Sequence, residues 1–167
     1  MGEAPADFME FAHAHSGRLF RTACLLTGDW HLAEDLVQET LAKMYRSWRR
    51  IDRSEPPLAY AHTVLSRTFV SQRRLRRSGE RPSEALPEPD GHLGDDPALR
   101  IALLEALAQL SPKDRTVLVL RYWEDRSVEE TARLMGIRVG SVRVRSLRAR
   151  DRLRQVLGPE FAELSRA

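Results

Sequence analysis

Seven arginines lie between residues 138 and 154, in a stretch that is expected to form a helix. On a helical projection, Arg143 and Arg148 share a side with Val144 and Leu147. An arginine can grip a guanine edge with two hydrogen bonds or hold a phosphate, and an apolar side chain can contact a thymine methyl. The opposite side carries a stripe of apolar and small residues, namely Val142, Ser146, Ala149, Leu153 and Val156. The stretch therefore predicts a helix that reads DNA, although a basic amphipathic helix packed on a protein partner or facing solvent would show the same pattern.

A short helix with clear start and stop signals precedes this stretch. Ser127 and Glu130 have the spacing of a capping box, in which each side chain bonds the backbone amide of the other residue. Gly136 supplies the left-handed turn that a residue with a side chain resists. We expect the second helix to begin near Gly140 or Ser141. Together these signals predict a helix-turn-helix whose second helix enters the major groove.

The cysteine, histidine, acidic and tyrosine residues form no pattern that indicates a catalytic or metal-binding site. Cys24 is the single cysteine, so an intramolecular disulfide and a cysteine zinc cluster are excluded. The five histidines form no ligand pattern, and Glu34, Asp35 and Glu39 do not share one face of a helix. The three tyrosines lack a surrounding catalytic set, which weakens the case for a nuclease or recombinase. We therefore predict a protein without catalysis, cofactor or metal.

The net charge of +3 hides a strong segregation of charge along the 167 residues. Residues 43–81 hold eleven Lys or Arg against three Asp or Glu, and residues 113–154 hold twelve against six. Between these blocks, residues 80–96 hold six acids and one base. Two basic blocks separated by an acidic strip predict two surfaces that bind polyanions.

The change in composition also predicts two small domains, residues 1–78 and residues 97–167. A flexible linker, rich in acids, proline and glycine, is expected over residues 79–96. Both domains are expected to be all-α, because Val, Ile and Thr do not alternate in runs. The helices expected before the helix-turn-helix are Ala6–Leu26, Trp30–Trp48, Pro57–Arg77, Ala98–Gln109 and Ser111–Trp123. We expect little contact between the two domains.

Three segments resemble the extracytoplasmic-function (ECF) sigma factors of bacterial RNA polymerase, and the actinobacterial members most of all. The helix with which those proteins bind the polymerase clamp is similar to residues 31–48, HLAEDLVQETLAKMYRSW. Their helix for the −10 promoter element looks like residues 57–77, PLAYAHTVLSRTFVSQRRLRR. Their −35-binding region is similar to residues 110–154, LSPKDRTVLVLRYWEDRSVEETARLMGIRVGSVRVRSLRARDRLR. The resemblance implies a dissociable sigma factor that directs promoter-specific transcription initiation.

The resemblance assigns candidate residues to three surfaces. Those implied for core RNA polymerase, through its β′ clamp and β subunits, are Asp35, Gln38, Glu39 and Ala42. Those implied for the −10 element are Arg53, Tyr60, His62, Ser66, Arg67, Ser71, Arg73 and Arg74. Those implied for the −35 element are Arg126, Arg138, Ser141, Arg143, Val144, Leu147 and Arg148. Carboxylates and an amide suit a basic partner helix, and a melted strand suits a cationic track with pockets for splayed bases.

The sequence departs from the common family pattern at both DNA-reading surfaces. Many members carry Asn near Ser66 or Arg67 and Asp near Ser71. Many also carry a Ser at the position of Val144, and a Ser or His at that of Leu147. These departures leave the base preference at both promoter elements open.

The alternative class is a free-standing helix-turn-helix regulator, which would bind DNA alone as a symmetric dimer. The separate N-terminal helical unit and the acidic linker argue against that class. The sequence has no signal peptide and no apolar run long enough to span a bilayer, so we expect a cytoplasmic protein without membrane contact. The expected partners are core RNA polymerase and promoter DNA, and the resemblance adds an anti-sigma factor that the sequence does not identify.

Overall fold

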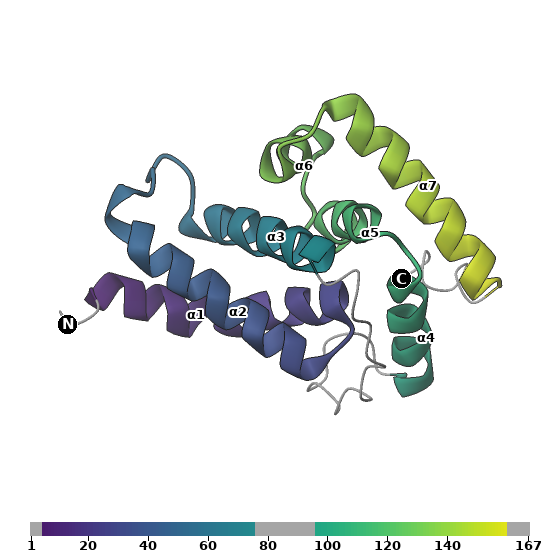
Figure 1. The fold of residues 1–167 in the computed structure, drawn as a ribbon, viewed down its shortest axis with the longest axis horizontal. Coiled ribbons are helices and arrows are strands. Elements are labelled where there is room, and N and C mark those ends of the chain that lie inside the picture. Colours follow the sequence, from purple (N-terminus) through teal and green to yellow (C-terminus); the bar gives the residue numbers. More distant parts are fainter. Residues whose placement is uncertain (1–4, 76–95, 160–167) are drawn as a thin grey trace.

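The computed structural model describes residues 5–75 and 96–159, and the regular structure in these ranges is helical throughout (Figure 1). The N-terminal half consists of α1 (Ala6–Thr27), α2 (Trp30–Ser47), the 3₁₀ turn η1 (Trp48–Arg50) and α3 (Pro57–Leu75). The C-terminal half consists of α4 (Pro97–Ala108), α5 (Pro112–Leu118), the π-helical turn η2 (Val119–Trp123), α6 (Val128–Met135) and α7 (Val139–Leu157). The all-α prediction is confirmed, and the expected helices lie where the observed ones do.

In the N-terminal half, α1, α2 and α3 pack side by side around a core of apolar side chains (Figure 1). Gly28, with a φ of 65°, ends α1 in the left-handed conformation that glycine adopts at no steric cost. Asp29 then begins α2, because its carboxylate accepts a hydrogen bond from the Leu32 amide at 3.0 Å. Leu36 of α2 and Leu65 of α3 are fully buried between the helices. The bundle therefore fixes which faces of α2 and α3 point outward.

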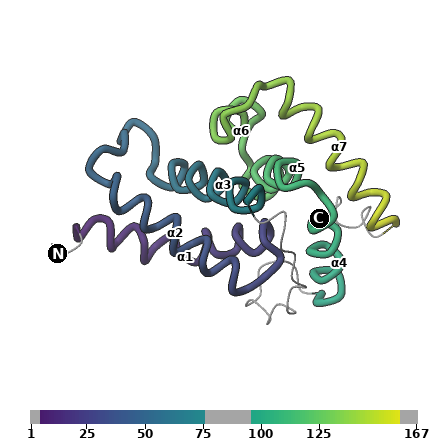
Figure 2. The backbone as a smooth tube through the Cα atoms, viewed as in Figure 1, coloured from purple at the N-terminus to yellow at the C-terminus, as the bar shows by residue number. Residues whose placement is uncertain are grey.

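The C-terminal half follows the local signals of the sequence closely. The predicted capping box is present: Ser127 Oγ accepts from the Glu130 amide at 3.0 Å, and the Ser127 amide donates to Glu130 Oε2 at 2.7 Å. Gly136 ends α6 with a φ of 65°, as predicted. The second helix begins at Val139, slightly earlier than expected, after an extended residue at Arg138. The helix-turn-helix geometry is thus confirmed, and α7 runs along the outer edge of this half (Figure 2).

The two halves pack against each other, so the expectation of little contact between them is wrong. α1 contacts α4, α5 and η2, while α3 contacts α5 and α6. One hydrophobic cluster crosses the boundary, from Leu26 in α1 to Leu107 in α4 and Leu118 in α5. A second, smaller cluster joins Val117 of α5 to Ala132 of α6 and Val142 of α7. Periodicity shows that a helix has an apolar side, but it does not show which other helix will cover that side.

Arg115 of α5 adds a polar tie across the same boundary. Its guanidinium donates to the carbonyl of Leu26 at the end of α1, and also to the carbonyls of Leu110 and Ala108 at 3.0 and 3.2 Å. Burial lowers the pKa of Arg115 to about 10, with a smaller contribution from Arg73, so the group stays charged at neutral pH. Carbonyls at a helix end lack partners within the helix, and a cation is a favourable partner for them.

Most of the expected linker lies outside the described residues, which include only its last member, Asp96. Asp96 caps α4 by accepting a hydrogen bond from the Ala98 amide at 2.9 Å. None of the described helices is long and apolar enough to cross a bilayer. The same part of the chain contains no cluster of His, Cys, Asp or Glu that could hold a metal ion.

Candidate nucleic-acid and protein interfaces

The outer face of α7 exposes large apolar side chains among its arginines. Val144 and Leu147 are each 62% exposed, whereas Val142 and Ala149 on the opposite side are fully buried against α5 and α6. The facing predicted for this helix is therefore confirmed. Large apolar side chains in solvent within a basic face are typical of a contact surface rather than of a plain solvated one.

The other residues predicted for the −35 element lie in different surroundings. Arg143 is exposed on the outer face of α7, and Arg138 is exposed at the start of the helix. Ser141, in the first turn, is half-buried. Arg126 is turned toward the N-terminal half, where its Nη2 lies 3.2 Å from Nδ1 of His62. Arg126 thus shares no face with the exposed residues of α7.

Arg148 is held in place by a carboxylate that the sequence did not single out. Asp114 of α5 accepts hydrogen bonds from Arg148 Nε at 2.9 Å and Arg148 Nη2 at 3.0 Å, and a third from Arg145 Nη1 at 2.7 Å. The Asp114 side chain is 8% exposed and that of Arg148 is 58% exposed. Two parallel hydrogen bonds from one guanidinium to one carboxylate fix both the orientation of the guanidinium and its distance from the carboxylate.

The outer face of α2 carries the residues predicted to bind polymerase. Asp35, Gln38 and Ala42 are exposed on successive turns of the helix. Glu39 is half-buried and accepts a hydrogen bond from Gln72 of α3, with Lys43 3.1 Å away. Asp35 and Gln38 therefore offer the more accessible polar groups of this surface.

Several of the residues predicted for the −10 element are open to solvent. Tyr60 is 37% exposed, and Arg53 stacks its guanidinium 4.4 Å from the centre of the Trp48 ring. Ser71 and Arg74 are exposed, and Arg73 is half-buried at the end of α3. These side chains can be reached from solvent in the described conformation.

Of the remaining residues of that set, His62 and Ser66 are buried, while Arg67 is exposed but bonded to the C-terminal half. His62 and Ser66 are 0% and 1% exposed, and α6 packs on the same helix. Arg67 donates to the carbonyls of Leu134 at 3.0 Å and Arg133 at 3.2 Å, which lie at the end of α6. In this arrangement His62 and Ser66 are not accessible to DNA, because Glu124 and Arg126 lie against His62 and α6 packs on α3.

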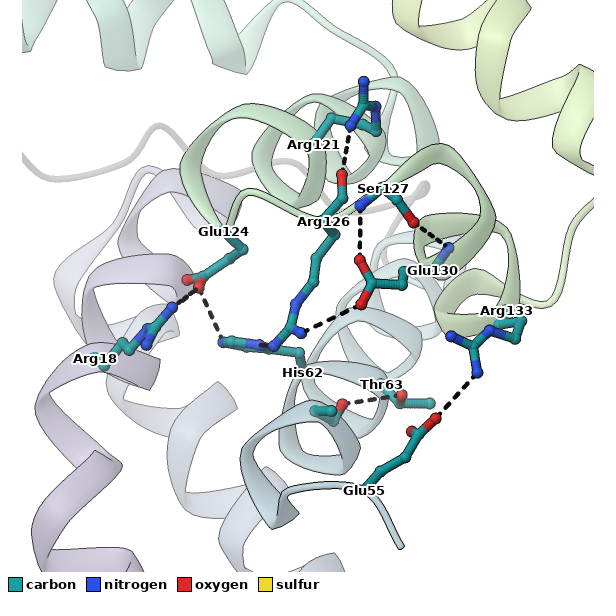
Figure 3. Close-up of polar contacts among 11 residues, drawn as sticks. Arg18, Glu55, His62, Thr63, Arg121, Glu124, Arg126, Ser127, Glu130 and Arg133 are labelled. Carbon is teal, nitrogen blue, oxygen red and sulfur yellow. Dashed lines mark hydrogen bonds and ion pairs between the residues drawn. The ribbon is translucent and has the colours of Figure 1, made fainter.

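A buried carboxylate at the end of η2 joins the two halves at this place (Figure 3). Glu124, with a side chain 1% exposed, accepts hydrogen bonds from Arg18 of α1 at 2.9 and 3.2 Å. Thr22 Oγ1 donates to its other oxygen, and Nε2 of His62 lies 3.5 Å away. Nothing in the sequence pattern signalled Glu124 or Arg18, since more than a hundred residues separate them along the chain.

His62 is neutral within this cluster. Burial lowers its pKa to about 4, although Glu124 acts in the opposite direction, while Arg126, Arg18 and His15 lower it further. Arginine can only donate, so the contact from Arg126 makes Nδ1 of His62 an acceptor. The neutral ring then carries its hydrogen on Nε2, the atom that faces Glu124.

Comparisons with known proteins agree with this arrangement of parts. Residues 11–79 match the family model described as Sigma-70 region 2, and residues 100–153 match Sigma-70, region 4. These two regions define a sigma-70-type transcription initiation factor. The match to region 2 also removes the free-standing helix-turn-helix regulator from consideration, because that class has no such region.

Comparison with individual sigma factors identifies the subfamily to which the chain belongs. The chain is 38% identical to the RNA polymerase sigma-E factor of Streptomyces coelicolor over 158 residues, covering 94% of this chain and 89% of that one. It is 32% identical to the ECF RNA polymerase sigma factor SigE of Mycolicibacterium smegmatis, covering 95% of this chain and 64% of that one. A structure of the sigma factor RpoE of Bartonella quintana, bound to the anti-sigma factor NepR, superposes with a TM-score of 0.76 at 26% identity, covering 93% of this chain and 99% of that one. The chain belongs to the ECF family of RNA polymerase sigma factors, which direct promoter-specific transcription initiation.

Proposed function

We propose that this sigma factor binds core polymerase, the −10 element and the −35 element through three separate surfaces. The outer face of α2 binds core polymerase, the loop after η1 together with α3 binds the melted −10 strand, and the outer face of α7 reads the −35 element. The observation that carries the proposal is the pair of exposed apolar residues, Val144 and Leu147, set among the arginines of a confirmed helix-turn-helix. In terms of the chain, we assign the first two surfaces to residues 1–78, the linker to residues 79–96 and the third surface to residues 97–167.

The polymerase surface is supported by the exposure of Asp35 and Gln38. A carboxylate and an amide that lie in solvent on a rigid helix complement a partner helix that carries Arg and Lys. Ala42 beside them lets such a helix approach closely. Glu39 is better placed to hold α2 against α3, through Gln72, than to contact a partner.

Binding of the −10 strand on α3 requires the two halves to separate. His62 and Ser66 are buried, and Arg67 is engaged by the end of α6, so the described conformation is closed with respect to these residues. Tyr60, Ser71 and Arg74 stay accessible and can make first contact with a flipped base or a phosphate. The closed form is then a resting state, and core polymerase and promoter DNA select the open one.

The protein acts by binding and not by catalysis. The residues of the three surfaces supply hydrogen bonds, apolar contact and positive charge, and the phosphodiester chemistry belongs to the polymerase. We place the protein in the cytoplasm, where polymerase and chromosome are found. Since the Bartonella quintana relative was solved with an anti-sigma factor, we also propose that a protein of that kind binds this chain.

The direct test is transcription reconstituted from purified core polymerase and this chain on a promoter library. We expect promoter-specific transcripts only when the chain is added. Asp35→Arg should lower the affinity for core polymerase at least tenfold, because it places a cation where a basic partner is expected, while its fold is retained. Glu10→Arg, an exposed acid on α1, is the matched control and should bind normally. Transcription that starts at random sites with or without the chain would refute the proposal.

A further inference from the structure

Asp114 occupies an unusual position for a carboxylate. It lies in the first turn of α5, where its amide donates to the capping residue Ser111 at 3.2 Å, and its side chain is buried at the contact with α7. Burial alone would raise the pKa of Asp114, but hydrogen bonds and charge from Arg148 and Arg145 hold it below its usual value. The carboxylate is therefore ionised and fully engaged by the recognition helix.

The guanidinium of Arg148 is fixed on one edge and open on the other. Nε and Nη2 donate to Asp114, and the side chain is still 58% exposed. Arg148 also borders a shallow groove together with Val144, Leu147 and Asp151. The remaining N–H groups of Arg148 thus lie beside the exposed apolar residues of the same face.

Arg143, on the same face, provides the contrast. Its partner, Glu129, is 4.0 Å away, and the two side chains are 65% and 67% exposed. An ion pair of that kind is weak and leaves a long side chain free to choose among rotamers. Two arginines of one reading face therefore differ in how firmly the protein holds them before DNA arrives.

We propose that Asp114 is a positioning residue that fixes Arg148 in the orientation for reading one base pair of the −35 element. The inference rests on the proposed function of α7. An arginine already held on one edge presents the other edge to a guanine without first losing side-chain freedom, and a guanine contact is directional. Arg143, which is not held, contributes mainly phosphate contacts. Asp114 touches no base and acts through Arg148.

The test uses the full chain with core polymerase on promoters randomised over the −35 element, comparing the wild type with Asp114→Asn and Arg148→Ala. We expect both variants to lose preference at the same single position, by about tenfold, since a good arginine–guanine pair discriminates by that order. The double variant should lose no more than Arg148→Ala alone, because the two residues act as one unit. Asp114→Glu should restore part of the preference, and Glu129→Gln should change none of it.

A purely structural role for Asp114 gives a different result. Asp114→Asn would then lower the melting temperature and reduce transcription from all library members equally, with an unchanged profile of preference, and that outcome overturns the proposal. If Asp114→Asn does not fold, Arg148→Lys replaces it, since a lysine keeps the charge but cannot be held by the two-pronged contact. The inference then predicts the same loss at one position, and an unchanged profile refutes it. Failure of the wild type to direct initiation would instead refute the proposed function.

Discussion

The outer face of α7 and the covered side of α3 both carry residues predicted to bind DNA, but they differ in exposure to solvent. On α7, Val144 and Leu147 are each 62% exposed, and no described segment packs over them. On α3, His62 and Ser66 are almost fully buried beneath the C-terminal half. The difference shows that one surface predicted to bind DNA is available in the resting molecule while another is closed by the molecule itself.

The two faces also differ in the kind of contact that maintains them. The orientation of α7 depends on apolar burial of Val142 and Ala149, which is insensitive to pH, and on the Asp114 contacts with Arg145 and Arg148. Although burial acts to raise the pKa of Asp114, these arginines hold it below its usual value, so that contact also persists at mildly acidic pH. The closed side of α3 depends in addition on Glu124 and His62, which are ionisable groups buried between the halves. Substitutions and pH should therefore alter the closed face much more than the open one.

The largest effect is expected from Glu124→Gln. An amide cannot neutralise Arg18, so the closed form should lose about 2 kcal/mol. This is within the range for a hydrogen bond to a charged group, and the partial solvation of Arg18 keeps it from being larger. Small-angle scattering should then detect an increased radius of gyration, while the helical content is unchanged. Glu129→Gln, at an exposed carboxylate on α6, is the control and should leave the molecule compact. A compact Glu124→Gln variant would contradict the role given to this cluster.

A smaller and graded effect is expected from pH. The pKa of His62 is about 4 in the closed form, mainly through burial, and near 6.5 for a solvated imidazole. The open form therefore binds the proton more tightly, so closing is fully favoured above about pH 6.5 and weakens as the pH falls toward 4. The limiting slope is about 1.4 kcal/mol per pH unit.

Fluorescence transfer between labels on the two halves, followed from pH 7.5 to 4.5, measures this slope. His62→Gln should flatten the profile between pH 6.5 and 5, where carboxylates are still ionised. Equal slopes for the wild type and the variant would show that another group controls closing.

The smallest effect on stability is expected on the open face. Leu147→Ser should change the free energy of unfolding by less than about 0.5 kcal/mol, as surface substitutions do, while shifting the preferred −35 sequence. Val142→Ser, on the buried side of the same helix, should cost about 2 kcal/mol because it removes apolar contacts and buries a hydroxyl. Thermal melts and binding-site selection separate the two effects. If Leu147→Ser proves as destabilising as Val142→Ser, the facing of α7 is incorrect.

Local signals made much of the fold predictable from the sequence. Ser127, Glu130 and Gly136 act within a few residues of themselves, so the capping box and the left-handed turn could be predicted directly. The stripe through Val142 and Ala149 follows from helical periodicity, and it gave the correct face of α7.

The contacts between the halves could not be predicted in the same way. Glu124 and Arg18 are each unremarkable in their local sequence, and only the packing of η2 on α1 brings them together. His62 was expected to face DNA because the roles taken from the family describe a sigma factor bound to promoter DNA. In the free chain, His62 is buried. Asp114 looked like an ordinary acid in the first turn of a helix, and its contacts with Arg145 and Arg148 depend on the angle between α5 and α7.

The most direct test of the closed and open forms is a distance measured between one spin label on α1 and one on α6. His13→Cys and Glu129→Cys provide exposed attachment sites. The native Cys24 is buried and its pKa is raised to about 12, mainly by burial, so it should not react. We predict a single short distance for the free protein, and a longer one once core polymerase and promoter DNA are bound. An unchanged distance in a transcriptionally active complex would contradict the claim that the halves must separate for the −10 element to bind.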